Sequence, residues 1–461
     1  MHLAGIAADQ THRAGKTVSR TTRFLHAAAL AALGAAGFLS LAGCGNNYRP
    51  VLTAINPVGP SAQPEKYAVV LSDPGNNNPG IVTLVDFSGD TVVITANVGV
   101  SPKYLILGTS GAYGYVINGD NTINNFSVIN SLITSQVLST TLPSGSVPTS
   151  IFPQSANIYV SDPGTNSVDQ LRQTTGSTTA SGTPIAFNQG LPVTNPTFVF
   201  GIPTANSRGY VLSSADSQSG GAPTAVGIDT ATNTLSAHLP VGVNPVYGVM
   251  TADGKRAFVM NKGDNTISVI NAQANTLDTT PATGSSIVPV GVGPIWADFA
   301  PTLNEVVVAN AGDGSSPGSL SLVSIPLCNA SSVTSNPNCD ANNPVDANGF
   351  GTLLKDIPVG VNPVMVSALQ DGTRAYVANA GNSTTEGSVS VVDLNSQRVT
   401  TTIPLSCHPN YIAATTGSPT GKVYVTCPDS KDMTVIRTDT DSIDLTIPLQ
   451  GTGVSVRVSA Q

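Results

Sequence analysis

The sequence predicts an all-β protein built from a repeated four-stranded antiparallel unit, and three observations support this fold class. Only 10% of the 461 residues are charged, while 45 are glycine and 33 are proline, which favours turns over long surface helices. The segment Pro-Val-Gly-Val-Asn-Pro at 240–245 recurs at 358–363, and again at 289–294 with Gly in place of Asn. Between these segments, short apolar runs alternate with turn residues, as strands do.

The repeat has a nearly constant length. The second proline of each copy, here called the anchor proline, stands at positions 102, 148, 196, 245, 294, 363 and 409. Successive anchors are 46, 48, 49, 49, 69 and 46 residues apart. A fixed period of this size is typical of a repeat architecture, and the one long interval predicts an insertion at about 326–352.

Each unit contains the same elements in the same order. An apolar run follows the anchor proline, and a turn with Asp-Gly leads to a second strand, expected at 256–261, 305–310 and 374–379. A Gly/Asn/Asp turn precedes the third strand, and the fourth strand runs into the next anchor. Four short antiparallel strands in such a unit are typical of one β-propeller blade. Unbroken apolar strands such as 306–309 indicate sheets covered on both faces, which favours a propeller over a sandwich.

The number of blades depends on how the chain ends pair. The seven anchors begin seven units, and residues 67–98 supply three further strands. The C-terminal segment 453–459 aligns with the innermost strand that begins at Pro245. Pairing this segment with the three N-terminal strands would close the ring without free edges, giving eight blades. Seven blades are the alternative, if the degenerate region 170–235 is not a complete blade.

The repeat resembles a known family. Tyr-Val-Ala-Asn at 376–379, Asn-Thr-Ile-Ser-Val-Ile at 265–270 and Ile-Pro-Val-Gly-Val-Asn-Pro at 357–363 are similar to the YVTN β-propeller repeat. The resemblance covers most of 66–461 and is clearest at 240–312 and 357–404. It implies a secreted or surface-exposed propeller.

The first 43 residues have the features of a targeting segment. Basic residues at 13, 16, 20 and 23 precede an apolar stretch at 24–41, which ends in Leu41-Ala42-Gly43-Cys44. This resembles the bacterial lipoprotein signal. The resemblance implies cleavage before Cys44, acylation of that cysteine, for example with palmitate, and a lipid anchor in a bacterial membrane. It further implies an outer-membrane protein that faces the periplasm or the cell surface. An ordinary signal peptide or a single transmembrane helix is the alternative.

The mature chain is then expected to divide into two parts. Residues 44–65 carry four prolines and little periodicity, so we expect a flexible tether. Residues 66–461 form the single propeller domain. We expect a monomer held at the membrane through its N-terminal lipid.

Four further cysteines are candidates for disulfides, which an exported chain permits. Cys328 and Cys339 both lie in the predicted insertion, where a bridge would tie down a long loop. In the repeat alignment, Cys407 occupies the position of Val361 and Cys427 that of Asn379. These positions lie near facing ends of the two inner strands of one blade, so we expect a second bridge there.

Polar turn residues are the candidate ligand-binding groups. The turns that contain the anchor prolines and those between the second and third strands fall on the same rim of a four-stranded blade. They place one set of residues around a mouth of the central channel, namely Asn244, Asn261, Asp264, Asn310, Asp313, Asn362, Asn379 and His408. Asn and Asp also favour turns for local hydrogen-bonding reasons, so capping of the turns is the alternative. Trp296 follows an anchor on an innermost strand, where it would pack between blades or offer a platform for a sugar.

The sequence favours a binding protein over an enzyme but does not decide between them. Beyond the targeting segment only His238 and His408 remain, and we find no metal-binding cluster or phosphate-binding glycine loop, so we expect neither metal nor cofactor. The net charge of −8 disfavours nucleic acid as a partner. We therefore expect a non-catalytic envelope lipoprotein whose propeller binds a protein or small ligand at one face. The alternatives are a hydrolase of the lactonase-like propeller type and an envelope assembly scaffold.

Overall fold

The computed structural model describes residues 65–108, 111–128, 137–154, 157–174, 184–202, 208–251, 254–280, 284–300, 302–325, 351–369, 371–415 and 421–460. Within these ranges the chain is all-β, with one 3₁₀ turn at Ser217–Ser219. No helix in these ranges is long and apolar enough to cross a membrane. The predicted targeting segment, most of the tether, Cys44 and nearly all of the insertion lie outside the described residues.

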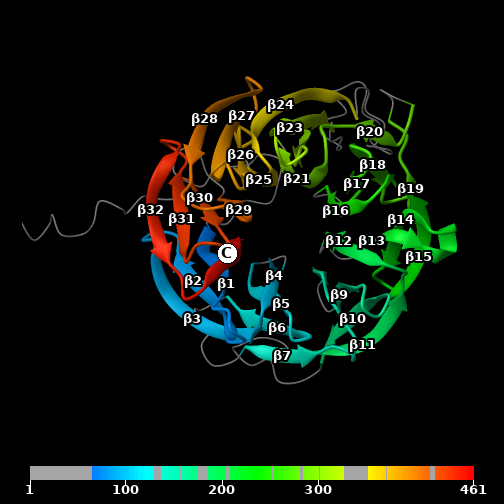
Figure 1. Ribbon diagram of the computed structural model, residues 1–461. Coiled ribbons are helices and arrows are strands. Elements are labelled where there is room, and N and C mark those ends of the chain that lie inside the picture. The colour runs from blue at the N-terminus through cyan, green and yellow to red at the C-terminus, as the bar shows by residue number, and fades with distance from the viewer. Residues whose placement is uncertain are drawn as a thin grey trace, which may run out of the picture. The chain divides into compact units, whose positions relative to one another are not determined.

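The strands form eight antiparallel sheets arranged as the blades of a propeller around a central channel (Figure 1). We number the blades along the chain, so that blade 1 contains β1. The innermost strands, in blade order, are β33 (Thr452–Ala460), β4 (Pro102–Leu107), β8 (Ser150–Gln154), β12 (Pro196–Gly201), β16 (Pro245–Met250), β21 (Pro294–Ala300), β25 (Pro363–Ala368) and β29 (Tyr411–Ala414). The second strands are β1 (Glu65–Asp73), β5 (Tyr113–Asn118), β9 (Asn157–Asp162), β13 (Arg208–Asp216), β17 (Arg256–Asn261), β22 (Glu305–Asn310), β26 (Arg374–Asn379) and β30 (Lys422–Thr426).

The outer half of each blade follows the same order. The third strands are β2 (Pro79–Asp86), β6 (Thr122–Ser127), β10 (Ser167–Gln173), β14 (Ala222–Asp229), β18 (Thr266–Asn271), β23 (Pro317–Ser324), β27 (Ser388–Asp393) and β31 (Asp432–Arg437). The outermost strands are β3 (Thr91–Val100), β7 (Leu138–Thr141), β11 (Ile185–Pro192), β15 (Thr234–Pro240), β19 (Thr276–Leu277) with β20 (Ile287–Pro289), β24 (Leu353–Val361), β28 (Arg398–Pro404) and β32 (Ser442–Pro448). The pair β19 and β20 is one outer strand of blade 5 that is interrupted, and both parts pair with β18.

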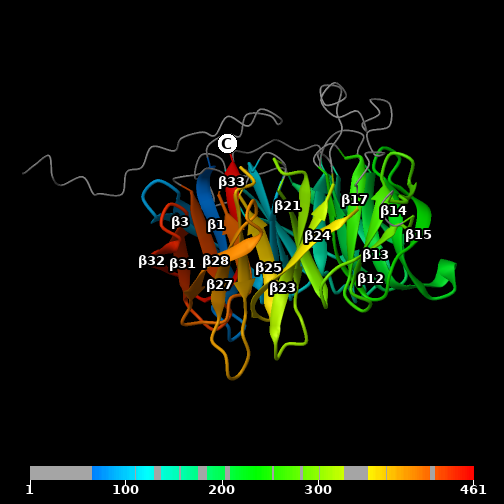
Figure 2. The same ribbon diagram turned by 90° about the horizontal axis from the view of Figure 1, so that it is seen from above.

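The predicted ring closure is confirmed. The C-terminal strand β33 pairs with β1 in an antiparallel register from Glu65↔Ala460 to Asp73↔Thr452, and the sheet order is β3-β2-β1-β33. Figures 1 and 2 show β33 beside β1, the strand farthest from it in the sequence. Because β8–β11 and β12–β15 are both complete blades, the seven-blade alternative is wrong.

The central strands are buried on both faces, as their unbroken apolar runs predict. Every residue of β17 and of β22 is buried. The three valines of the closing strand are not equivalent, however. Val456 is fully buried, whereas Val454 and Val458 are only partly buried, and the register shift opposite Leu71/Ser72 leaves Val454 unpaired as a bulge.

The Pro-Val-Gly-Val-Asn-Pro segment is the crossing from one blade to the next. Its glycine passes over a buried asparagine at the end of the next blade's second strand. A Cβ on Gly360 would lie 2.6 Å from Cγ of Asn379, too close for any other residue. The residue before the anchor proline has a positive φ, 53° for Asn244 and 52° for Asn362, which asparagine tolerates better than most residues. The repeated sequence therefore follows from backbone geometry.

A tyrosine of the second strand joins several blades to their neighbours. The Tyr159 hydroxyl donates to Oδ1 of Asn233 at 2.6 Å, and the Tyr376 hydroxyl donates to Oδ1 of Asp441 at 2.7 Å. Both acceptors have positive φ in the turn between the third and outermost strands of the next blade. Between blades 8 and 1, the equivalent acceptor Asp90 also pairs with buried Lys422 at 2.5 Å. These contacts fix the spacing of the blades around the channel.

Candidate functional site

The positions of the predicted polar ring do lie on one rim of the propeller. The buried asparagine side chains among them, however, make hydrogen bonds within their own blades. The two turn types do meet on this rim, because Lys262 N donates to Asn244 O at 3.0 Å. Asn261, Asn310 and Asn379 are nevertheless fully buried. In each case Nδ2 donates to two hydroxyls of the third strand in its own blade, as Asn379 does to Ser388 and Ser390. A ligand at the channel mouth cannot reach these amides.

The remaining ring residues are exposed or partly exposed and cap local turns. Asp264 accepts from Val243 N, and Asp313 accepts from Ser315 N and Ser316 N. Asn244 and Asn362 hold the positive-φ position described above. The members from different blades share no contact, so the ring does not converge on one binding site.

His408 differs from the asparagines that it replaces, because it has a charged partner. Its Nδ1 lies 2.6 Å from Oδ2 of Asp429, and both side chains are exposed. The hydrogen bond to Asp429 raises the pKa of His408. His238 is similarly paired with Asp216 at 2.5 Å. Both histidines thus contact a carboxylate, which is exposed for His408 and buried for His238.

One of the two predicted disulfides is present in the described residues. Cys407 and Cys427 form a bridge whose Cα atoms are 6.1 Å apart, between the start of β29 and the end of β30. Cys427 O also accepts from N of Gly453 on the closing strand at 2.9 Å. The bridge therefore lies beside the place where the ring closes. Cys328 and Cys339 lie outside the described residues.

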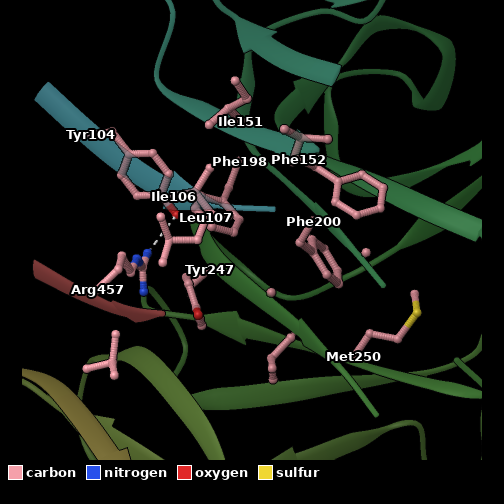
Figure 3. Close-up of a pocket in the computed structure, with 15 residues that line it drawn as sticks. Tyr104, Ile106, Leu107, Ile151, Phe152, Phe198, Phe200, Tyr247, Met250 and Arg457 are labelled. Atoms are coloured by element: carbon pink, nitrogen blue, oxygen red, sulfur yellow. Dashed lines mark hydrogen bonds between the residues drawn. The ribbon is translucent and has the colours of Figure 1, made fainter. Parts of the chain in front are cut away.

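The central channel contains a cavity of about 320 Å³ that the sequence does not reveal (Figure 3). Its wall is formed by the innermost strands of blades 1 to 5, and it is open to solvent on one side. Its fifteen lining residues are mostly apolar and include one charged side chain, Arg457: Tyr104, Ile106, Leu107, Ile151, Phe152, Phe198, Val199, Phe200, Gly201, Tyr247, Gly248, Val249, Met250, Arg457 and Val458. A concave, largely apolar site with a few polar groups, here Arg457 and the tyrosine hydroxyls, is typical of small-molecule binding.

The repeat explains which side chains meet in the channel. The second and fourth residues after an anchor point toward the innermost strand of the next blade. There, small polar side chains bind its free backbone N–H groups: Ser150 Oγ accepts from Val199 N at 2.7 Å, and Asp298 Oδ2 accepts from Ala368 N at 2.9 Å. Where these positions are aromatic, the rings instead fill the space between neighbouring strands.

Aromatic rings at the second position form a continuous cluster across several blades. The Tyr247 and Trp296 rings stack with centroids 4.0 Å apart, and Phe198 lies 4.9 Å from Tyr247. Trp296 also meets Tyr411 edge-on at 5.8 Å, although blade 7 separates their blades in the ring. Trp296 thus packs between blades, as one of its two sequence interpretations proposed. The cluster spans the channel next to the cavity.

Arg457 of the closing strand completes this cluster. Its guanidinium lies 4.6 Å from the centroid of the Tyr411 ring, 5.7 Å from that of Tyr104 and 6.0 Å from that of Trp296. Contacts of this kind stabilise a cation by about 0.5–2 kcal/mol each. Nε of Arg457 donates to Leu105 O at 3.1 Å, and a terminal nitrogen donates to the Tyr104 hydroxyl at 3.3 Å.

Burial controls protonation in this region. It raises the pKa of Tyr247 and of Tyr411, which therefore remain neutral phenols. Burial also raises the pKa of the Asp298 carboxyl to about 6, although the N–H groups of Ala368 and Phe299 oppose this shift. Near neutral pH, Arg457 is the permanent charge of the cavity wall.

Sequence reasoning missed this site because the relevant residues differ between blades. The aromatic residue two positions after the anchor is visible in the sequence at 104, 198, 247, 296 and 411. That recurrence was the available signal. The place of Arg457 could be found only by aligning the closing strand with the other innermost strands, where it falls at the position of Val249.

Comparisons with known proteins extend to the fold alone. The sequence matches no protein-family model and no curated protein. Among solved structures, apo AztD from Citrobacter koseri is similar with a TM-score of 0.55 at 14% identity, covering 86% of this chain and 98% of that one. The dihydro-heme d1 dehydrogenase NirN in complex with DHE has a TM-score of 0.58 at 10% identity, and the match covers 88% of this chain and 77% of that one. A candidate 6-phosphogluconolactonase from Bacteroides fragilis has a TM-score of 0.51 at 13% identity, and the match covers 86% of this chain and 98% of that one. These likenesses support the propeller fold.

Proposed function

We propose that this chain is an exported, lipid-anchored β-propeller of the YVTN type that binds a small molecule in its central cavity. The observation that carries the proposal is the cavity itself, which has a volume of about 320 Å³ and is lined by aromatic and aliphatic side chains of five innermost strands. A volume of this size is within the usual range of ligand pockets. The Leu-Ala-Gly-Cys segment ending at Cys44 supports the anchor, which would hold the propeller at a bacterial membrane facing the periplasm or the cell surface.

Binding is favoured over catalysis by the character of the lining. A lactonase-like hydrolase needs an acid, a base or a metal ion that converges on the substrate. The fifteen residues that line this cavity comprise apolar and aromatic side chains, two glycines and one arginine. An arginine stays protonated and can hold a ligand, but it does not act as a general base near neutral pH.

The central cavity is also favoured over the rim as the binding site. The rim amides are buried within their own blades, and its carboxylates accept from backbone N–H groups of adjacent turns. The cavity wall, in contrast, offers open apolar surface. Burial of such surface by a ligand contributes roughly 25 cal/mol per Å².

The test uses the full chain with Cys44→Ala, so that no lipid is attached, and two flat probes, 2-naphthoate and neutral 2-naphthamide. Isothermal titration calorimetry should show saturable one-to-one binding of at least one probe. Val249→Phe, which adds volume to the cavity wall, should abolish it. Val243→Phe is the matched control, because Val243 is 56% exposed on the rim.

Folding of both variants is checked by circular dichroism, and Ile106→Phe provides a second cavity-filling change at the equivalent position of blade 2. If neither probe binds, or if both cavity-filling variants bind as the parent does, a ligand site in the cavity is refuted.

A further inference from the structure

Arg457 has more hydrogen-bonding capacity than the protein uses. A guanidinium carries five N–H donors. The structure gives Arg457 two hydrogen bonds, to Leu105 O and to the Tyr104 hydroxyl. Within the described ranges its other N–H groups donate to no protein atom. The contacts by which Arg457 holds blade 1 against blade 2 therefore use fewer than half of the five N–H donors of its guanidinium.

The charge of Arg457 is also without an ionic partner among the described residues. The two basic side chains that are buried in the described blades are paired, Arg256 with Asp278 at 3.1 Å and Lys422 with Asp90 at 2.5 Å. The charge of Arg457 acts on the carboxyl of Asp298, but the two oxygens of that carboxyl accept from Ala368 N and Phe299 N. The raised pKa values keep the phenols of Tyr247 and Tyr411 neutral, and the Tyr104 hydroxyl accepts a hydrogen bond from Arg457, so none of the three is a carboxylate-like counter-ion.

The Arg457 side chain is partly buried, and a cation withdrawn from water without a counter-ion carries a desolvation penalty. Aromatic faces offset part of it. A carboxylate, sulfonate or phosphate would offset more, because a guanidinium binds such groups through two parallel N–H donors. Figure 3 shows Arg457 at one side of the cavity, opposite the apolar side chains of Phe200 and Met250.

From this arrangement we infer that the cavity takes a small organic anion, whose acidic group binds Arg457 and whose apolar body lies among Ile106, Phe198, Phe200 and Met250. The inference rests on the proposed function and names the ligand class of the same site. A flat or branched apolar carboxylate has the matching chemistry, with one charge at the end that faces the closing strand.

The experiment compares the affinities of the full chain with Cys44→Ala for 2-naphthoate and 2-naphthamide, two probes of nearly equal shape that differ in charge. Calorimetry at pH 7 should give at least tenfold tighter binding of the carboxylate. Arg457→Met should remove this preference while leaving the amide affinity within about twofold, and Arg398→Met on the outermost strand β28 should leave both affinities unchanged. Arg457→Lys retains the charge but not the paired donors, so its preference should be intermediate.

The outcomes separate this inference from the function on which it rests. Equal binding of the two probes by the unsubstituted cavity would overturn the anion assignment and leave a ligand-binding cavity in place. Absence of binding by both probes would refute the proposed function as well. Because the comparison of probes needs no change at Arg457, the inference remains testable even if Arg457→Met does not fold.

Discussion

Deletion of residues 452–461 should destabilise the whole propeller rather than trim one end of it. These residues form β33, whose pairing with β1 extends over eight residue pairs. At about 0.5–1.5 kcal/mol of net stability for each hydrogen bond, a ladder of this length contributes at least about 4 kcal/mol. Burial of the Val456 side chain contributes roughly a further 2 kcal/mol. Small folded domains have net stabilities of about 5–15 kcal/mol, so the loss is comparable to the whole.

The deletion also exposes adhesive edges. Without β33, strand β1 presents unpaired N–H and C=O groups to the channel, and β4 loses its contacts with Arg457. We expect the truncated chain to melt at a much lower temperature and to elute as oligomers in size-exclusion chromatography. An unchanged melting temperature together with a monodisperse monomer would refute the argument that β33 closes the ring.

A single substitution in β33 tests the same ring closure with a smaller expected loss of stability. Val456→Ala should lower the free energy of unfolding by roughly 1–3 kcal/mol, since it removes buried methyl groups. Val93→Ala in β3 is the matched control, because that valine belongs to the same blade but is 42% exposed on its outermost strand. Chemical denaturation of the two variants should separate them, and equal effects would contradict the burial assigned to Val456.

Four other predictions follow from the sequence and the contacts. Cys44→Ala should release the protein from membranes, and a variant that stays in the membrane fraction after a carbonate wash would exclude the lipid anchor. Replacing Cys407 and Cys427 by alanine should cost about 2–4 kcal/mol of stability, and non-reducing peptide mapping should recover both in one cross-linked peptide rather than as free thiols. Tyr376→Phe, which removes a hydrogen bond to a carboxylate of blade 8, should cost about 1–2 kcal/mol in chemical denaturation. Burial raises the pKa of Asp298 from 3.8 to about 6, so the folded state holds this proton more tightly and stability falls as pH rises from 4 to 7. The expected fall is about 2 kcal/mol, and a denaturation series in which Asp298→Asn keeps the same pH slope would contradict it.

The fold could be predicted because the backbone geometry of each blade crossing requires particular residue types at fixed positions. Glycine in the blade crossing is required by the close approach to a buried asparagine, as at Gly360 over Asn379, and the asparagine before each anchor tolerates a positive φ. These constraints recur in several blades, so their spacing is visible in one sequence. The same regularity made the disulfide between Cys407 and Cys427 predictable, since one blade alone has cysteines at the two facing positions.

The same regularity makes the rim the conspicuous candidate site in the sequence. Conspicuous, repeated polar residues such as Asn261 and Asn310 suggested a ligand ring, but their repetition reflects their role in the blades, where they are fully buried. A binding site in a pseudo-symmetric ring depends on what differs between repeats. Arg457 is such a difference, and its hydrogen-bond partners Tyr104 and Leu105 lie more than 350 residues away in the sequence. Only the closed ring brings them together.

The most direct test of a ligand site in the central cavity is a crystal structure of the full chain with Cys44→Ala soaked with 6-bromo-2-naphthoate. Anomalous scattering locates the bromine without reference to the fold. The bromine peak should lie among Phe200, Val249 and Met250, with the carboxylate density on the guanidinium of Arg457. A bromine peak on the rim or against an outermost strand, with the cavity free of ligand density, would contradict the assignment.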